Sequence, residues 1–464
     1  MVNNANDQRR QSFRLGEGAR EDGGTSDSRP FVGDAGRKSE GIVDVATVTI
    51  GMVAFALAVG FLVGFTVFSI MNVSTWLTAL LWGGLGEAVN VWWFSLVACT
   101  VGGAIIGLWT WWSGDRVQPL ESVMDQFRAT GSYKTDGAIR PAVSFLLPLV
   151  FGGSVGFEAG LTGLIAAGCC WIRDELKAAG LRAGAVADVT IAASMAAIFG
   201  TPLAGIVAGA ESAPHDGRYV LEEPDVNDYT MRRGAKVVLY TAAAFGAFGG
   251  VALFSSVFGT PGGLPRFGAI TATGAELLWV VPCIAAAYVM TLLYHASSRL
   301  FAAVSAHLGD GRAGTLAKPV VAGFAMGAIA CALPYVLFPG ESQSEELMLT
   351  WTTWSAAALI ATGFLKAVVT PMCLNMGWMG GSFFPSIFAG TAAGFGLAAI
   401  TGADPMLMVA VTATAFLSGV VRKPLLVLAI LLLCFPFEGI LWMGLAAVAG
   451  AALPIPRALL PRRS

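Results

Sequence analysis

The stretch Gly-Gly-Ser-Val-Gly-Phe-Glu-Ala-Gly, residues 152–160, is the feature around which the rest of the chain is organised. Glu158 is the only charged residue between Pro141 and Ile172, in a segment apolar enough for a membrane. A charge at mid-bilayer depth costs about 3 kcal/mol or more, so a carboxylate kept there usually faces a pathway or a partner. This position predicts a functional role for Glu158.

Four glycines accompany Glu158 within this stretch. The spacing Gly-Gly-x-x-Gly-x-x-x-Gly is typical of places where backbones approach closely or a membrane helix breaks. A break leaves free amides at the start of the next half-helix, and such amides attract anions. We therefore expect an anion site at a broken helix, with Glu158 as its titratable neighbour.

The composition indicates a polytopic membrane protein rather than a soluble enzyme. Of 464 residues, 55% are hydrophobic and 12% are charged, and the mean hydropathy is +0.69. The net charge of -2 argues against a nucleic-acid partner. The seven cysteines lie in apolar segments at no metal-ligand spacing, so they are interpreted as core residues, and neither metal nor cofactor is expected.

Polarity divides the chain into three parts. Residues 1–41 are rich in Gly, Ser, Arg and Asp and are predicted to form a disordered cytoplasmic tail. Residues 42–236 are predicted to form a first transmembrane repeat and its polar hinge, and residues 237–464 a second repeat with a short C-terminal tail. The expected spans outside the Glu158 segment are 42–71, 89–112, 186–210, 237–258, 276–294, 319–338, 351–374, 385–400 and 406–451, the last long enough for two.

The two halves carry corresponding breaks. Gly156 precedes Pro202 by 46 residues, and Gly381, in a second Gly-rich break, precedes Pro424 by 43. Paired broken segments of this kind point to a site at a repeat interface in a secondary transporter.

At these residues the chain resembles the CLC family of chloride channels and chloride/proton antiporters. Residues 380–386, Gly-Gly-Ser-Phe-Phe-Pro-Ser, resemble its Gly-x-Phe-x-Pro anion motif. Residues 156–160 resemble its Gly-Arg/Lys-Glu-Gly-Pro gating motif, without the basic residue and the proline. The Pro-Leu-Ala-Gly-Ile stretch at 202–206 fits the helix that follows in the family, and the matches run from about residue 115 to residue 450.

The resemblance implies an all-α polytopic protein of the cell membrane, with a two-repeat CLC architecture of broken and tilted helices. It further implies a homodimer with one pathway per subunit, and chloride conduction or chloride/proton exchange rather than enzyme activity. Glu158 would act as the gate. The implied anion-binding residues are Gly156, Phe157, Gly381, Ser382, Phe383 and Pro385.

Several family residues are replaced. Arg116 stands where the first anion motif has a serine, and no tyrosine follows Tyr335, with Phe435, Phe437 or Glu438 nearest the family's late tyrosine. Proton-coupled family members have an internal glutamate after the Pro-Leu-Ala-Gly stretch. Ser212 stands at that position here, and Glu211 is its neighbour. Weak or absent proton coupling is therefore expected. Selectivity for another anion, such as nitrate or fluoride, stays open. The sequence also leaves open whether the protein is a channel or an exchanger.

Structural alternatives accompany each functional hypothesis. Glu158 could pair with Ser154 or Thr162, and the second break could be a tight contact of small residues. Glu211 could be a polar cap or a proton relay. Lys366, the only charge in 359–385, could snorkel to an interface or draw anions into a cytoplasmic vestibule, together with Arg116. The remaining alternative in a different class is a non-transporting scaffold.

Overall fold

A computed structural model describes the chain over 49–114, 139–161, 192–194, 196–198, 202–203, 206, 233–259, 265–271, 274, 276–309, 311–456 and 458–459. The chain divides into two units, Met1–Glu40 and Gly41–Ser464, and every described residue belongs to the second. The predicted tail and hinge lie outside the described residues, as do Arg116, Glu211 and Ser212. The boundary between the two repeats stays a prediction.

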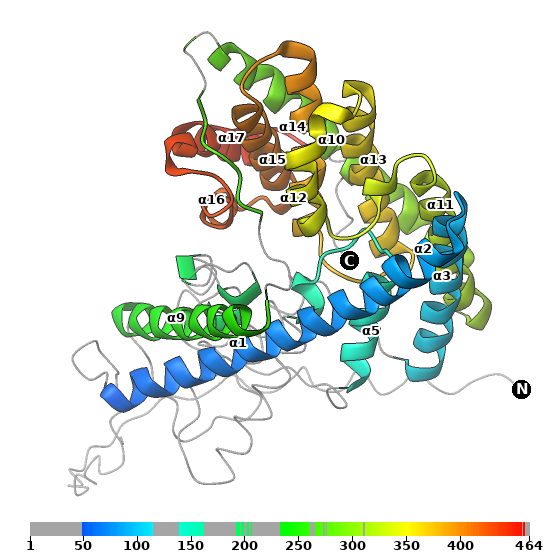
Figure 1. The fold of residues 1–464 in the computed structure, drawn as a ribbon, viewed down its shortest axis with the longest axis horizontal. Helices are drawn as coiled ribbons and strands as arrows, with labels where there is room; N and C mark the ends of the chain where they lie inside the picture. The colour runs from blue at the N-terminus through cyan, green and yellow to red at the C-terminus, as the bar shows by residue number, and fades with distance from the viewer. Residues whose placement is uncertain are drawn as a thin grey trace, which may run out of the picture. The chain divides into compact units, whose positions relative to one another are not determined.

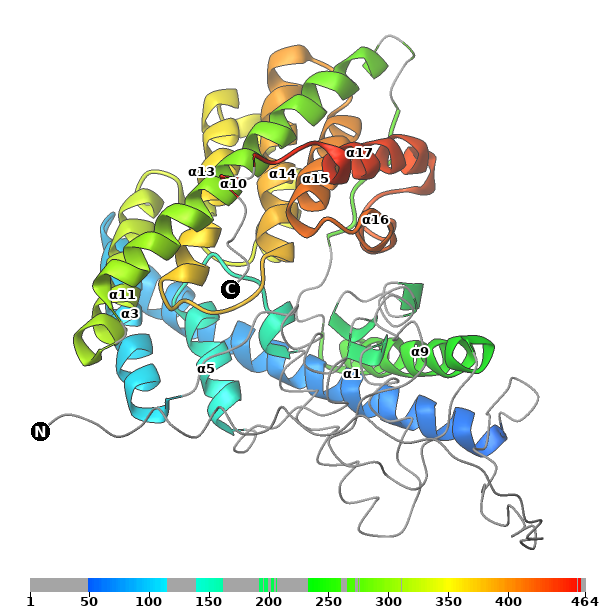
Figure 2. The same ribbon diagram turned by 180° about the vertical axis from the view of Figure 1, so that it is seen from behind.

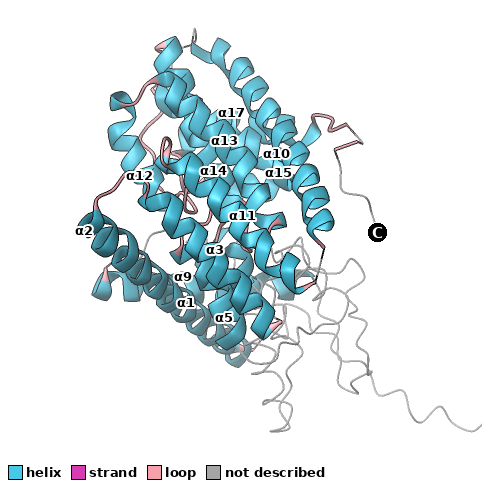
Figure 3. Cartoon of the chain, turned by 90° about the vertical axis from the view of Figure 1, so that its right-hand side faces the viewer, coloured by secondary structure: helices cyan, strands magenta, loops and turns pink. Residues whose placement is uncertain are grey.

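The described part is built from helices, and Figure 3 shows no strand in it. Seven helical segments are long and apolar enough to cross a membrane, which confirms the predicted all-α polytopic class. The elements are α1 Ile50–Thr78, the π-helix η2 Ala79–Gly86, α2 Glu87–Val89, α3 Phe94–Ser113, α5 Ile139–Val150, α9 Arg233–Phe258, η3 Glu276–Trp279, α10 Val280–Leu308, α11 Arg312–Ala330, η4 Pro334–Val336, α12 Glu341–Thr350, η5 Trp351–Thr353, α13 Ala356–Asn375, α14 Phe383–Thr401, α15 Pro405–Val421, α16 Pro424–Leu431, η6 Phe437–Gly439 and α17 Ile440–Ala452.

Several predicted span boundaries are wrong. The span predicted at 276–294 continues to Leu308, and the one predicted at 319–338 runs from Arg312 to Ala330. The first span does not end at Met71 but continues without interruption to Val89. Its polar residues stay in the helix because they bond to its own backbone, as Asn72 does by donating to the Phe68 carbonyl at 3.2 Å. The segment 406–451, predicted to be long enough for two spans, contains α15 and α17 with the short α16 between them, which starts at Pro424.

Small residues let the helices approach closely. A Cβ added at Gly60 or Gly64 of α1 would overlap the carbonyl groups of Ala243 and Ala247 in α9. The two helices lie side by side in Figures 1 and 2. Close backbone approach of this kind is the usual way in which membrane helices associate.

Helix α14 is the central element of the second half. It packs against α13 on one side and α15 on the other, and nearly all of its residues are buried. Its first residue, Phe383, follows the second Gly-rich break directly. The start of α14 is therefore enclosed by protein, and this position determines where the candidate site can form.

Candidate functional site

The two Gly-rich breaks meet each other through their backbones. The Gly156 amide donates to the Gly381 carbonyl at 2.7 Å, and the Gly381 amide donates to the Gly156 carbonyl at 2.6 Å. The pair forms an isolated antiparallel bridge. Gly156 and Gly381 were both predicted to belong to the anion site, and their amides are engaged with each other's carbonyls. The structure thus joins the two breaks, as predicted, while these two glycines do not supply free donors.

Glu158 lies at the point where the bridge meets the start of α14. Its side chain is fully buried, and its residue begins a helical turn in which the Leu161 amide donates to the Phe157 carbonyl at 3.0 Å. The Phe383 amide, the first of α14, donates to Glu158 Oε1 at 2.5 Å. The carboxylate therefore occupies a helix N-terminus, where backbone amides and the helix dipole favour negative charge.

The glycines of the bridge make room for this carboxylate. A Cβ added at Gly156 would overlap Glu158 Oε2, and one added at Gly381 would overlap Oε1 and Cδ of the same side chain. The space between the two glycines is thus the space that the carboxylate fills. The role of these residues is clearance, which explains why glycine stands at both positions.

Aromatic side chains close the site. The rings of Phe157 and Phe384 lie 4.2 Å apart between centroids, and both are buried. Pro385 is buried in the first turn of α14, where a missing amide hydrogen costs no helical bond. Ser382 precedes the helix, and its side chain makes no capping hydrogen bond. An apolar surround strengthens any interaction between an anion and the remaining amides.

Ser154 was considered as a structural partner of Glu158. Its Oγ lies 3.1 Å from Thr370 Oγ1 in α13, so this hydroxyl ties the break to a helix of the other half. Thr162, the other considered partner, lies outside the described residues.

Phe435, one of the residues nearest the missing tyrosine, is buried and stacks on Phe267 at 4.5 Å. Its ring offers no hydroxyl to an anion.

Lys366 has a position that the sequence did not predict. The side chain is fully buried in α13, and its ammonium donates to four successive carbonyls, those of Tyr335, Val336, Leu337 and Phe338, at 2.8 to 3.2 Å. It also lies 4.8 Å from the centroid of the Phe388 ring. Neither predicted role, snorkelling or a vestibule, fits this position, because both need an exposed ammonium.

The loop held by Lys366 supports the Glu158 segment. The Phe338 amide donates to the Gly152 carbonyl at 3.1 Å, at the start of the first Gly-rich break. Lys366 therefore links α13 to the Glu158 segment through one loop. Among the described residues no group of His, Cys, Asp and Glu could hold a metal ion.

Comparison with known proteins identifies the family. A family model described as voltage gated chloride channel matches residues 102–454, which is more than half of the chain, and the chain therefore belongs to this family, the CLC family. Membership supports anion transport as its function. No curated protein sequence matches the chain.

Solved structures agree with the fold. A CLC-type fluoride/proton antiporter is similar at a TM-score of 0.64 and 15% identity, over 87% of this chain and 96% of that one. A slow cyanobacterial Cl-/H+ antiporter gives 0.63 and 17%, over 87% and 95%. A eukaryotic CLC transporter gives 0.62 and 14%, over 86% and 70%. At these identities the likeness establishes the CLC fold and not the transported ion.

The Glu158 carboxylate fills the space beside Gly381, so the effect of adding a methyl group there should depend on Glu158. Gly381→Ala should destabilise the protein by roughly 1–3 kcal/mol, because the new Cβ overlaps the Glu158 carboxylate. The loss should largely vanish in a Glu158→Ala background. Unfolding temperatures in detergent measure both. Gly249→Ala is the control, since a Cβ there meets nothing within 4 Å. An equal loss with and without Glu158 would contradict the assignment of this space.

The Lys366 clamp predicts a structural cost for removing its charge. Lys366→Met should destabilise the protein by roughly 3 kcal/mol or more, because it leaves buried carbonyls without a donor. Arg299→Met, which removes an exposed cation from α10, should change stability little. Thermal unfolding followed by intrinsic fluorescence measures both. Similar unfolding temperatures for the two variants would show that the clamp contributes nothing.

Proposed function

We propose that the chain transports an anion along a pathway that passes the start of α14, with Glu158 as the gate. Chloride is the first candidate for this anion. The observation that carries this proposal is the Glu158 carboxylate at the α14 N-terminus, accepting a hydrogen bond from the Phe383 amide. An ionised carboxylate is itself an anion. The Glu158 carboxylate occupies the position that an entering ion would take, and it accepts from the Phe383 amide that would bind that ion.

The mechanism follows from competition for that place. When Glu158 is ionised, it fills the space between Gly156 and Gly381 and excludes the ion. When a proton binds to the carboxylate, the attraction to the amide and the helix dipole falls, and the side chain can leave. The Phe383 amide then binds the anion. Because amides carry partial rather than full charges, the ion binds without being trapped.

A second anion is favoured by specific observations. Arg116 and the absence of a late tyrosine remove the hydroxyl donors that the family uses for chloride, and one similar structure is a fluoride/proton antiporter. Fluoride is therefore the second candidate and nitrate the third, and both should be tested beside chloride. The lack of a carboxylate at Ser212 favours conduction, or exchange with weak proton coupling, over tight exchange.

Membership of the family supports a proposal for assembly and location. The proposal includes a homodimer in the cell membrane, with a complete pathway in each subunit. It includes no cofactor and no nucleic-acid partner.

Replacing the gate carboxyl predicts a loss of pH sensitivity. Glu158→Gln mimics the protonated side chain, so anion flux should become independent of pH, whereas wild-type flux should rise as the pH falls. Flux from proteoliposomes at a series of pH values measures this. Glu87→Gln removes an exposed carboxylate from α2 and should keep the wild-type profile. An unchanged pH profile in Glu158→Gln would count against the gate.

Reconstitution tests the proposed function as a whole. Purified protein in liposomes should release chloride down a gradient, with weak or no proton counter-movement recorded in the same vesicles. Fluoride and nitrate are substituted in parallel, and protein-free liposomes are the control. Strong uphill proton movement would overturn the coupling prediction, and flux with another anion alone would reassign the ion. No flux with any of the three would refute the proposal.

A further inference from the structure

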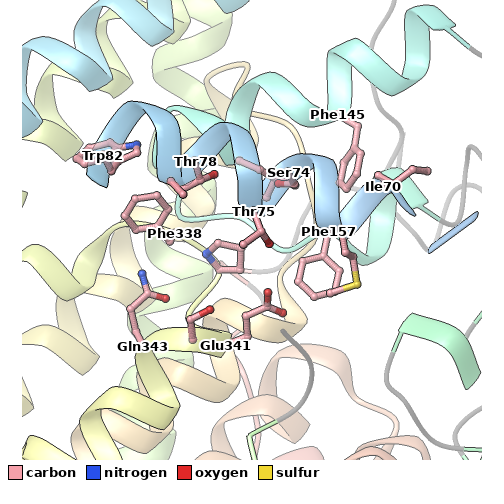
Figure 4. A pocket seen from close by; sticks show the side chains of 15 residues that line it. Ile70, Ser74, Thr75, Thr78, Trp82, Phe145, Phe157, Phe338, Glu341 and Gln343 are labelled. Atoms are coloured by element: carbon pink, nitrogen blue, oxygen red, sulfur yellow. The ribbon is translucent and has the colours of Figure 1, made fainter. Parts of the chain in front are cut away.

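A cavity of about 270 Å³ lies beside the gate segment. Its walls come from the end of α1, from Phe145 and Leu149 of α5, from Phe157 and from the residues that open α12. Figure 4 shows these side chains around the space. Thr75 and Ser342 in its wall are exposed, so the cavity opens to the surface of the described part of the chain.

The cavity is large and polar enough to hold water. Its volume accommodates several water molecules, each of which needs two to four polar partners. Hydroxyl, amide and carboxyl groups supply such partners from two sides, those of Ser74, Thr75 and Thr78 in α1 and those of Glu341, Ser342 and Gln343 in α12. Phe157, the residue before Glu158, forms part of the same lining.

One oxygen of the Glu341 carboxyl makes no hydrogen bond within the described part of the chain. Figure 4 shows Glu341 pointing from the start of α12 toward Thr75 and Phe157. Its Oε2 is enclosed and has no hydrogen-bond partner among the described residues. Burial raises the pKa of Glu341, and the charges of Glu345 and Glu158 raise it further. A carboxyl in this setting keeps its proton at a higher pH than an exposed one does.

The surroundings of Glu341 contain few other charges. Glu345 is on its own helix, Glu158 is on the gate segment, and Lys366 of α13 is engaged by the Phe338 carbonyl at the edge of the cavity. Neither α1 nor α14 carries a titratable side chain, and the one on α5 is Arg140, which is exposed. Glu346 of α12 accepts a hydrogen bond from the Tyr335 hydroxyl at 2.8 Å. Glu341 lies in the cavity wall, and Glu158 directly follows the lining residue Phe157 in the chain.

Resting on the proposed gate role of Glu158, we propose that Glu341 is a proton-transfer residue that loads the gate through this cavity. The Glu341 carboxyl gives its proton to a cavity water, that water gives a proton to the Glu158 carboxylate, and Glu341 takes a replacement from solvent. One proton enters and one is bound, so the step balances. No cation other than the proton is needed, because the Glu158 carboxylate becomes neutral when it is protonated.

A pH jump on proteoliposomes tests this role. After acidification, Glu341→Gln should slow the rise of anion flux by about tenfold or more, because a general acid is lost. Glu341→Asp should restore part of the rate. Glu345→Gln, an exposed carboxylate on the same helix, is the matched control and should respond like wild type.

The double variant separates transfer through the gate from a general structural effect. In a Glu158→Gln background, Glu341→Gln should cause no further change, because no gate carboxyl remains to be loaded. A wild-type rate in Glu341→Gln would overturn the proposal, and so would a lower flux in the double variant than in Glu158→Gln alone.

Chemical labelling tests the proton on Glu341 without any transport. Dicyclohexylcarbodiimide reacts with protonated carboxyls in apolar surroundings, so at neutral pH it should modify Glu341 and leave Glu345 unmodified, as read by peptide mass spectrometry. Absent flux together with Glu341 labelling would refute the proposed function alone. Absence of label on Glu341 would refute this inference even where flux is normal.

Discussion

The hydrogen bond from the Phe383 amide to the Glu158 carboxylate is the interaction on which the arrangement of this site depends. It places an acidic side chain at the start of a deeply buried helix, α14, where a helix N-terminus offers positive potential without a full charge. The same potential can bind a small anion. In the proposed mechanism the carboxylate and a transported ion compete for this place, and protonation of Glu158 decides between them.

Two further features keep that place in position. The Gly156–Gly381 bridge joins the break of one half to the break of the other, and the absence of side chains at both glycines leaves the volume that the carboxylate fills. Lys366 fixes the loop 335–338, whose Phe338 amide binds the Gly152 carbonyl. A buried cation is thereby used for support, because four carbonyls replace its hydration.

The sequence predicted the membrane class, most spans and the place of Glu158, because a lone charge among glycines in an apolar run is a local signal. It did not predict α12, since Glu341, Glu345 and Glu346 make that helix too polar for a span. The Lys366 clamp was missed because its carbonyl partners lie about thirty residues away and backbone groups leave no mark in the sequence. The engagement of the Gly156 and Gly381 amides likewise depends on tertiary pairing.

The central claim is that the Glu158 carboxylate and the anion use the same place at the start of α14. The most direct measurement is a crystal structure of Glu158→Gln grown with bromide, whose anomalous signal locates the ion. The account predicts a bromide peak within hydrogen-bond distance of the Phe383 amide, between Gly156 and Gly381, with the glutamine side chain displaced. Bromide bound elsewhere while this place stays empty or filled by the glutamine would contradict it.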